Sequence, residues 1–303
     1  MPTQPAAARF LEVPATRSED VDAVSRQRGA SSLQIVGLTA VIACAGAVIL
    51  FAAGDDGADL PDRPAARTDA NSQLAHQQLL AKAQQGRIDV YFLGDSITRR
   101  WGCTDPQYAD LLAHWREQFH GWHAANFGWG ADQTQHILWR LEHGELDGIH
   151  PKVIVVLAGT NNIRPLGEHA PADAVESQAE RISRGVAAIV RQCRQRAPDA
   201  TVILTAVFPR SDQPGVMPVI EAANRRIVQL ADGSSIRWLD VSDRLADSHG
   251  TALPAMFVDG LHPTVAGYQA WADGLRPLLT ELLGPPGDED FAPPPTGDPS
   301  SAH

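Results

Sequence analysis

Cysteine is scarce in this chain of 303 residues, and its three copies, Cys44, Cys103 and Cys193, lie far apart. No two of them form a C-x-x-C pair, so the sequence implies neither a disulfide framework nor a zinc ribbon. Cys103 and Cys193 could pair in an oxidising compartment, although two separate thiols are the simpler interpretation.

Positive charge is also in short supply. The chain has 25 Lys and Arg residues against 36 Asp and Glu, which gives a formal net charge of -11. Nucleic-acid binding depends on clustered Lys and Arg, and no basic patch interleaved with aromatic residues occurs here. The sequence therefore predicts no nucleic-acid partner, and no motif in it implies a metal ion or an organic cofactor.

One long apolar run stands out. Residues 33–53 contain no charged side chain and match the roughly 20 residues that a helix needs to cross a membrane. Two arginines precede the run and three aspartates follow it, so the positive-inside rule predicts a cytoplasmic N-terminus and an extracytoplasmic remainder. Two alternatives are a cleaved signal peptide, for which the polar lead is long, and a lipoprotein signal ending at Cys44.

The composition divides the rest of the chain into segments. Residues 1–32 are expected to be a disordered cytoplasmic tail, residues 54–71 a linker, and the Pro-rich residues 284–303 a second disordered tail. Residues 72–283 remain as one globular domain of ordinary size.

Within this domain, short apolar runs alternate with longer stretches of helical period. Strands are predicted at residues 88–93, 123–127, 153–157, 202–206 and 236–239. Helices are predicted between and after them, at residues 105–119, 132–144, 171–196, 216–231 and 264–283. Nearly continuous Val, Ile and Leu in strands separated by helices indicates a parallel sheet covered on both faces. The expected fold is an α/β three-layer sandwich around a five-stranded parallel sheet.

A serine follows the first predicted strand, in the stretch Gly94-Asp95-Ser96. Such a triplet is often only a turn, and it lacks the second glycine of the G-x-S-x-G nucleophile elbow. A serine becomes a useful nucleophile when a base takes its proton and a third group orients that base.

His262 is the best candidate for that base among the eleven histidines. It follows Asp259 by three residues in "VDGLHPT", on a turn before the last predicted helix. This spacing can bring the carboxylate beside Nδ1 and leave Nε2 free to accept the serine proton. An Asp-x-x-His at this place could also be a capping turn. Three other histidines, His114, His120 and His123, lie within ten residues of one another, but their spacings fit no closed metal site.

A hydrolytic serine also needs hydrogen-bond donors for the oxyanion. Asn161 follows the third strand and can offer its side-chain amide. The glycine-bearing loop 126–132 follows the second strand and can offer backbone amides. Because the carboxyl ends of parallel strands share one edge of the sheet, these groups are expected to meet Ser96 there.

These blocks resemble the SGNH, or GDSL-type, hydrolase superfamily. The stretches "GDS", "NFGWGAD", "GTN" and "DGLH" correspond to its four sequence blocks, and "NFGWGADQTQHILWRLEHGEL" followed by "PKVIVVLAGTNN" is similar to the catalytic subunits of intracellular platelet-activating-factor acetylhydrolase. The resemblance covers about residues 88–283 and implies the flavodoxin-like SGNH hydrolase fold.

The resemblance also implies a role for each matching residue. Ser96 corresponds to the nucleophile, His262 to the general base and acid, and Asp259 to its orienting partner. The oxyanion donors would be the amides of Ser96 and Ala131 and the side chain of Asn161. Ala131 departs from the family, which has glycine there, and alanine would be strained if the site requires a positive φ.

The function expected from these residues is a membrane-anchored, extracytoplasmic serine esterase that acts on short-acyl, especially acetyl, esters of a carbohydrate or lipid. Arg99, Trp101 and Trp129 lie near the catalytic turns and are candidates for substrate contact, unless the tryptophans belong to the core. Alternatives are an O-acyltransferase with the same triad, a lysophospholipase or lipase, and a catalytically silent binding module. The sequence leaves the oligomeric state and Arg100 unassigned.

Overall fold

The computed structural model describes residues 60–301 of the chain. The predicted tail 1–32 and the predicted membrane span 33–53 lie outside the described residues. From Leu60 to Ser301, no helix is both long and apolar enough to cross a membrane.

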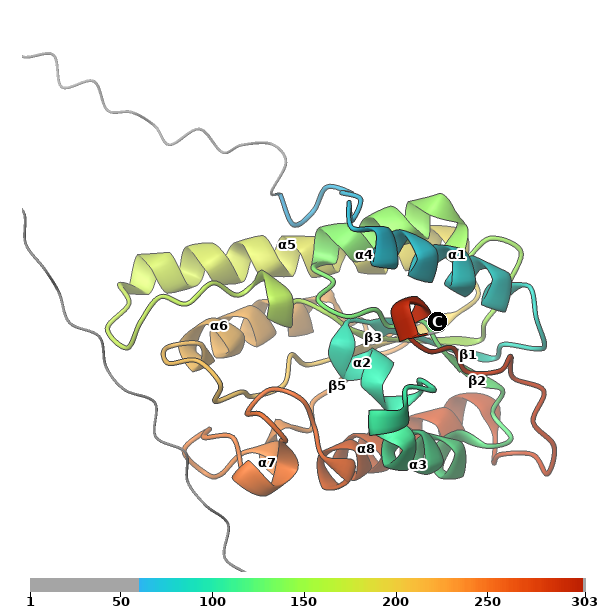
Figure 1. Cartoon of the computed structure of the whole chain (residues 1–303). Helices are drawn as coiled ribbons and strands as arrows, with labels where there is room; N and C mark the ends of the chain where they lie inside the picture. Colours follow the sequence, from blue (N-terminus) through green and yellow to red (C-terminus); the bar gives the residue numbers. More distant parts are fainter. Residues whose placement is uncertain (1–59, 302–303) are drawn as a thin grey trace, which may run out of the picture. The chain divides into compact units, whose positions relative to one another are not determined.

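A five-stranded, wholly parallel sheet forms the centre of the domain (Figure 1). Its strands run in the order β2-β1-β3-β4-β5. Their bounds are β1 Val90–Gly94, β2 Ala124–Asn126, β3 Val153–Leu157, β4 Thr201–Thr205 and β5 Ile236–Leu239. All five predicted strands are confirmed, with ends that differ by no more than two residues.

The strands are almost continuously apolar because both faces of the sheet are covered. Side chains alternate between the faces along a strand. In β1, Tyr91 and Leu93 belong to one core cluster, whereas Val90 and Phe92 belong to the other. Neither set is exposed to solvent, so the alternation of polar and apolar residues typical of a one-sided sheet is missing.

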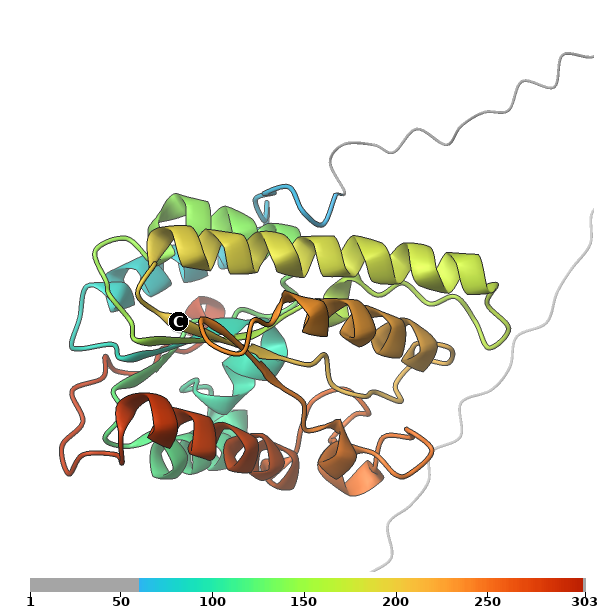
Figure 2. The ribbon, with the colours of Figure 1, turned by 180° about the vertical axis from the view of Figure 1, so that it is seen from behind.

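Four helices pack in the core on the Tyr91 side of the sheet, and Figures 1 and 2 show α5 as the longest of them. They are α1 Ala70–Ala83, α4 Thr134–Arg140, α5 Ala172–Arg196 and α6 Met217–Ile227. A kinked turn over Leu141–Glu145 follows α4, and its backbone leaves the helical conformation at His143 and Gly144. The predicted helices at 132–144, 171–196 and 216–231 are thereby confirmed.

The other face carries an aromatic core. Its helices are α2 Ser96–Trp101, α3 Ala109–Phe119, α7 Ser242–Leu245 and α8 Val265–Leu283. Trp101, Trp115 and Trp271 pack here against Phe92 of the sheet. The predicted helices at 105–119 and 264–283 are confirmed, and Thr264 caps α8 by accepting the amide of Gly267.

Part of the expected linker 54–71 belongs to the folded domain. The Pro61 carbonyl accepts a hydrogen bond from Thr134 Oγ1 at 2.7 Å, and Ala65 donates its amide to the Gln135 carbonyl at 3.0 Å. Asp69 then caps α1 through the amide of Ser72. The prediction is therefore wrong from Leu60 onward, because these backbone groups pair with α4 of the domain.

The expectation of a disordered C-terminal tail is also wrong for Gly284 to Ser301, a segment we call the C-terminal strap. Its backbone exchanges hydrogen bonds with Gly121, Arg87 and Thr104 at 2.7 to 3.2 Å. Asp298 in the strap accepts a bond from Asn71 of α1 at 2.9 Å. Proline and glycine prevent a core here, but they do not prevent docking through backbone groups.

The cysteines within the described chain do not pair. Cys103 and Cys193 are both buried and both free. Each sits in an apolar setting that raises the pKa of its thiol, to about 12 for Cys193. The disulfide that remained open on sequence grounds is not formed, and both residues serve as small apolar side chains.

Candidate active site

Ser96 stands at the start of α2, immediately after β1. Asp95 caps this helix by accepting the Ile97 amide at 2.9 Å. Gly94 is required for close packing, because a Cβ atom there would lie 2.2 Å from Thr98 Oγ1 and 2.5 Å from the Leu157 carbonyl. The Ser96 amide, as the first of the helix, has no partner within the helix and faces outward from its N-terminus.

His262 reaches Ser96 from the turn that precedes α8. Its Nε2 lies 2.9 Å from Ser96 Oγ, and its Nδ1 lies 2.7 Å from Asp259 Oδ2. The other carboxylate oxygen of Asp259 accepts the backbone amides of His262 and Leu261, at 2.8 and 3.1 Å. One carboxylate therefore fixes both the backbone turn and the imidazole orientation.

Burial favours the neutral form of the His262 imidazole. Burial lowers the pKa of His262; the hydrogen bond that its Nδ1 donates to Asp259 opposes this effect, and the charges of Arg100 and Arg210 add to it. Burial alone would raise the pKa of Asp259, but hydrogen bonds from His262 and Leu261 hold it at about 2. An ionised carboxylate beside a neutral imidazole is the state in which Nε2 can accept a proton.

The glycine-bearing loop packs directly on the serine turn. A Cβ atom at Gly128 would lie 2.5 Å from the Arg99 amide nitrogen and 2.8 Å from the Asp95 carbonyl, so only glycine fits. Trp129 donates its amide to the Gly94 carbonyl at 3.1 Å. Asn161 joins the same loop, because its Nδ2 donates to the Asp132 carbonyl at 2.9 Å.

Ala131 adopts the conformation that its side chain disfavours. Its φ is +60°, in the left-handed region that glycine enters without strain. No hydrogen bond from the Ala131 amide to another described residue is formed. The sequence raised this strain as one of two outcomes for Ala131, and the structure has the strained one.

A buried arginine joins the strand ends from beneath. Arg140 of α4 donates to Asp132 Oδ2 at 2.8 Å, to the Phe127 carbonyl at 3.0 Å and to the Gly94 carbonyl at 3.3 Å, and it also binds Glu145. Burial raises the pKa of Asp132 to about 6, an effect that Arg140 opposes. Sequence reasoning passed over Arg140, although a charged residue within the apolar stretch "HILWRL" is a usable signal.

The three side chains that the sequence offered for substrate contact have partners within the domain. Trp101 is fully buried in the aromatic core and donates its Nε1 hydrogen to His114 Nδ1 at 2.9 Å, so its assignment to substrate is wrong. Trp129 is also buried, bound to Ser72 Oγ, with the Arg99 guanidinium 4.8 Å above its ring. Arg99 pairs with Asp105 at 2.7 Å. All three side chains serve packing within the domain.

Arg100, unassigned from sequence, does approach the site. Its Nη1 lies 3.5 Å from Asp259 Oδ2, and its guanidinium lies 5.2 Å from the centre of the Tyr108 ring. This arginine therefore shares the carboxylate that orients His262. Nothing in the sequence marked it, because only the folded chain brings α2 to the turn before α8.

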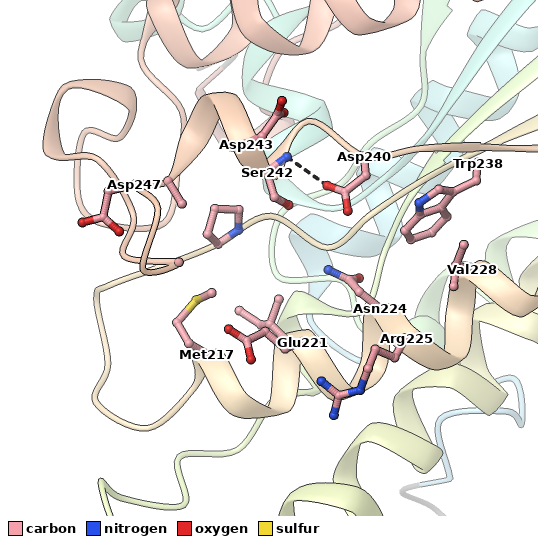
Figure 3. A pocket seen from close by; sticks show the side chains of 14 residues that line it. Met217, Glu221, Asn224, Arg225, Val228, Trp238, Asp240, Ser242, Asp243 and Asp247 are labelled. Carbon is pink, nitrogen blue, oxygen red and sulfur yellow. Dashed lines mark hydrogen bonds between the residues drawn. The ribbon is translucent and has the colours of Figure 1, made fainter.

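A cavity of about 550 Å³ opens away from these residues, between α6 and the segment after β5 (Figure 3). Glu221 and Arg225 of α6 line it opposite Asp240 and Asp243, and Ser96, Asp259 and His262 do not. Across residues 60–301, no group of three or more His, Cys, Asp or Glu side chains is arranged to hold a metal ion.

Comparisons with known proteins show which family the chain resembles. Residues 92–270 match the GDSL-like Lipase/Acylhydrolase family. Platelet-activating factor acetylhydrolase IB subunit alpha1 of Bos taurus is 35% identical over 213 residues, which cover 69% of this chain and 82% of the relative. The alpha2 subunit of Homo sapiens is 34% identical over 210 residues, covering 69% and 83%.

Solved structures share the fold. A crystal structure of a proposed acylhydrolase from Bacteroides fragilis superimposes with a TM-score of 0.54 at 20% identity, covering 71% of this chain and 99% of that one. At this identity the likeness supports the fold alone. The family match spans more than half of the chain, and the two mammalian relatives align over most of their length. The chain therefore belongs to the GDSL-like lipase/acylhydrolase family and is an esterase of that type.

Proposed function

We propose that the chain is a membrane-anchored, extracytoplasmic serine esterase whose catalytic triad is Ser96, His262 and Asp259. The observation that carries the proposal is the unbroken series of short contacts from Ser96 Oγ through both imidazole nitrogens to the Asp259 carboxylate, at 2.9 and 2.7 Å. Residues from opposite ends of the domain meet there in the order that nucleophilic catalysis requires.

The reaction follows from these contacts. Ser96 Oγ attacks the ester carbonyl carbon while its proton passes to His262 Nε2. His262 then gives the proton to the alcohol oxygen as the carbon–oxygen bond breaks, which leaves an acyl group on Ser96. Water attacks this acyl-enzyme with His262 again as base, and the acid product and free Ser96 are released. Asp259 stays ionised throughout and stabilises the transient imidazolium.

Three donors are proposed for the oxyanion: the amides of Ser96 and Ala131 and the side chain of Asn161. The Ser96 amide is the first of α2, and the Ala131 amide has no partner among the described residues. Asn161 Nδ2 carries two hydrogens, and the bond to the Asp132 carbonyl uses one to orient the side chain. Loss of one such donor typically costs on the order of 10² to 10³ in rate.

Acetyl or another short acyl group is proposed as the acid part of the substrate, on a carbohydrate or lipid alcohol. The similar mammalian proteins are named acetylhydrolases of platelet-activating factor, which supports a small acyl group. Trp101 and Trp129, two of the side chains that the sequence offered for substrate contact, are buried in the domain.

The membrane anchor is proposed on sequence grounds. Residues 33–53 provide an uncharged run of sufficient length, with Arg26 and Arg28 before it and Asp55 and Asp56 after it. This arrangement would place the esterase domain outside the cytoplasm and close to the membrane surface.

Hydrolysis of p-nitrophenyl esters, from acetyl to long acyl chains, tests the function in the full chain. Ser96→Ala should lower kcat by on the order of 10⁴ or more, because the nucleophile is lost. Ser183→Ala is the matched control, since this partly buried α5 serine donates its hydroxyl to the Glu180 carbonyl and lies outside the proposed triad. Equal activity of wild type and Ser96→Ala would refute the triad.

The same assay separates the possible acyl groups and acceptors. Rates highest for acetyl esters would support the acetylesterase, and rates highest for long acyl chains would indicate a lipase. Product analysis with a sugar or lipid alcohol present would reveal acyl transfer to the alcohol instead of water.

A further inference from the structure

Arg210 is a buried arginine between two parts of the proposed catalytic site. It follows β4, and only 6% of it is exposed. Its Nη1 donates to the backbone carbonyl and to Oγ1 of Thr160, both at 3.1 Å. Thr160 directly precedes Asn161, so these two bonds hold the turn that presents the proposed oxyanion donor.

The other edge of the same guanidinium holds its own loop. Nε and Nη2 of Arg210 donate to the two carboxylate oxygens of Asp212, each at 2.6 Å. This parallel pair of bonds has the fork geometry that only arginine offers a carboxylate. All three donor groups of Arg210 therefore act at once, and the loop 209–212 is fixed relative to Thr160.

This loop in turn touches the turn that bears the proposed base. Ser211 donates its amide to the Gly260 carbonyl at 2.8 Å. Gly260 has φ +77°, and a Cβ atom there would lie 2.8 Å from the Asp212 amide nitrogen and 2.9 Å from Ser211 Oγ. The two segments are packed so closely that a shift of one must move the other, and with it Asp259 and His262.

Stability alone is a poor reason for this arrangement. Taking a guanidinium and its carboxylate out of water costs about as much as their attraction returns, so a buried ion pair is weak evidence of net stabilisation. Its clear effect is geometric, because four charge-assisted bonds leave one orientation of the loop.

We propose that Arg210 is a positioning residue, which sets the distance between the Asn161 turn and the Asp259–His262 turn around Ser96. The inference rests on the proposed function of those residues and extends it to a side chain that touches no reacting atom. A displacement of about 1 Å at a reacting centre can cost on the order of 100-fold in rate, so positioning is a measurable role.

The charge of Arg210 has a second, separable effect. Charged groups that act on His262 are Asp259, which raises its pKa, and Arg100 and Arg210, which lower it in addition to burial. Removal of the Arg210 charge should therefore raise the pKa of His262. The acidic limb of the kcat/KM profile should then move to higher pH.

Two substitutions in the full chain distinguish geometry from charge. Arg210→Met removes both, so kcat should fall at least tenfold with KM changed less than threefold, and the acidic limb should move to higher pH. Arg210→Lys keeps the charge but not the fork. It should leave the limb in place and restore only part of kcat.

Arg237→Met is the matched control. Arg237 also forms a two-pronged pair, with Glu281 at 2.7 and 3.0 Å, but it lies on β5 and does not contact the site residues. Its kcat should stay within twofold of wild type. Circular dichroism would establish that each variant is folded at the assay temperature.

The inference would be overturned by a folded Arg210→Met protein with wild-type kcat, or by an equal loss of kcat in Arg237→Met. If Arg210→Met does not fold, Asp212→Asn weakens the same fork from the loop side and should lower kcat severalfold. The proposed role of Arg210 would also be overturned if the single variants Asp212→Asn and Arg210→Lys both had the kcat of wild type. Activity remaining in Ser96→Ala would refute the triad itself, whereas inactive Ser96→Ala beside fully active Arg210→Met would refute only this role.

Discussion

At the scale of single residues, Ala131 is a point where the backbone is strained. It is one of two non-glycine residues with positive φ among residues 60–301; the other is His123. A left-handed conformation costs an L-residue with a Cβ atom about 1 to 2 kcal/mol. The chain accepts this cost at a loop that packs against the serine turn.

Ala131→Gly should therefore stabilise the protein. The strain is relieved, although glycine loses more backbone entropy on folding, so the expected net gain is about 1 kcal/mol. For a domain of this size that corresponds to roughly 2 to 4 °C in Tm, which thermal unfolding would measure. Esterase activity should stay within a few-fold of wild type, because glycine offers the same backbone amide.

Ala231→Gly provides the opposite control. Ala231 has φ -74° at the end of a short helical turn, so glycine relieves nothing there and should lower Tm. A decrease of Tm in both variants would show that the φ of Ala131 carries no strain.

The site residues also show what the sequence can reveal at this scale. Asp259 and His262 are three positions apart, so their pairing is a local property that the sequence displays. Arg210 has partners 50 positions away in Thr160, and an arginine after a strand is usually a surface residue. Trp101 was assigned wrongly for a different reason: residue type alone does not distinguish a core tryptophan from one that binds a ligand.

At the scale of elements, prediction succeeded where burial is dense and failed where it is sparse. The strand Val153–Leu157 is apolar throughout because it is buried on both faces, and its bounds were predicted without error. The six-residue helix α2 is too short to show a period; it forms because Asp95 caps it and the core holds Trp101. The helix α1 was missed because Leu74, Leu79 and Leu80 are its only large apolar residues.

The C-terminal strap escaped prediction because backbone groups, rather than apolar side chains, hold much of it in place. Gly287 donates its amide to the Gly121 carbonyl at 3.0 Å, and Arg87 donates to the Phe291 carbonyl at 2.7 Å. Gly121 has φ +83°, and a Cβ atom there would lie 2.0 Å from the Gly287 carbonyl oxygen. A glycine on the body thus lets the strap approach.

Removal of residues 285–303 should lower stability. Each hydrogen bond contributes about 0.5 to 1.5 kcal/mol net, so loss of several should cost about 2 to 4 kcal/mol, or roughly 4 to 16 °C in Tm. Thermal unfolding of the full and shortened chains would measure it. An unchanged Tm would contradict the docking of the strap.

Gly121→Ala makes this test specific. Gly121→Ala should lower Tm more in the full chain than in the shortened chain. Only the full chain has both the strained φ and the clash with Gly287. Equal losses of stability in the two backgrounds would mean that the strap does not press on Gly121.

At the scale of the whole molecule, the proposed catalytic site and the proposed membrane anchor lie in different parts of the chain and are tested separately. The described domain has a complete sheet, two covered faces and a strap, and all site residues lie within it. We therefore expect hydrolysis at the proposed triad to depend on groups within residues 60–301. The apolar run 33–53 instead bears on where the enzyme works, since about 20 uncharged apolar residues transfer favourably into a bilayer.

Fractionation of cells that express the full chain and a chain without residues 1–59 would test the anchor. The full chain should remain in the membrane fraction after washes with high salt and carbonate, because an inserted helix is not released by either. The shortened chain should be released while hydrolysing short-acyl esters with similar kcat.

An arginine at the middle of the run, as in Ala43→Arg, should weaken insertion by about 3 kcal/mol, whereas Ala43→Leu should not. Recovery of the full chain in the released fraction, or of Ala43→Arg in the membrane at the level of Ala43→Leu, would contradict a spanning helix. Exposure of the domain to added protease in spheroplasts would then determine on which side of the membrane it lies.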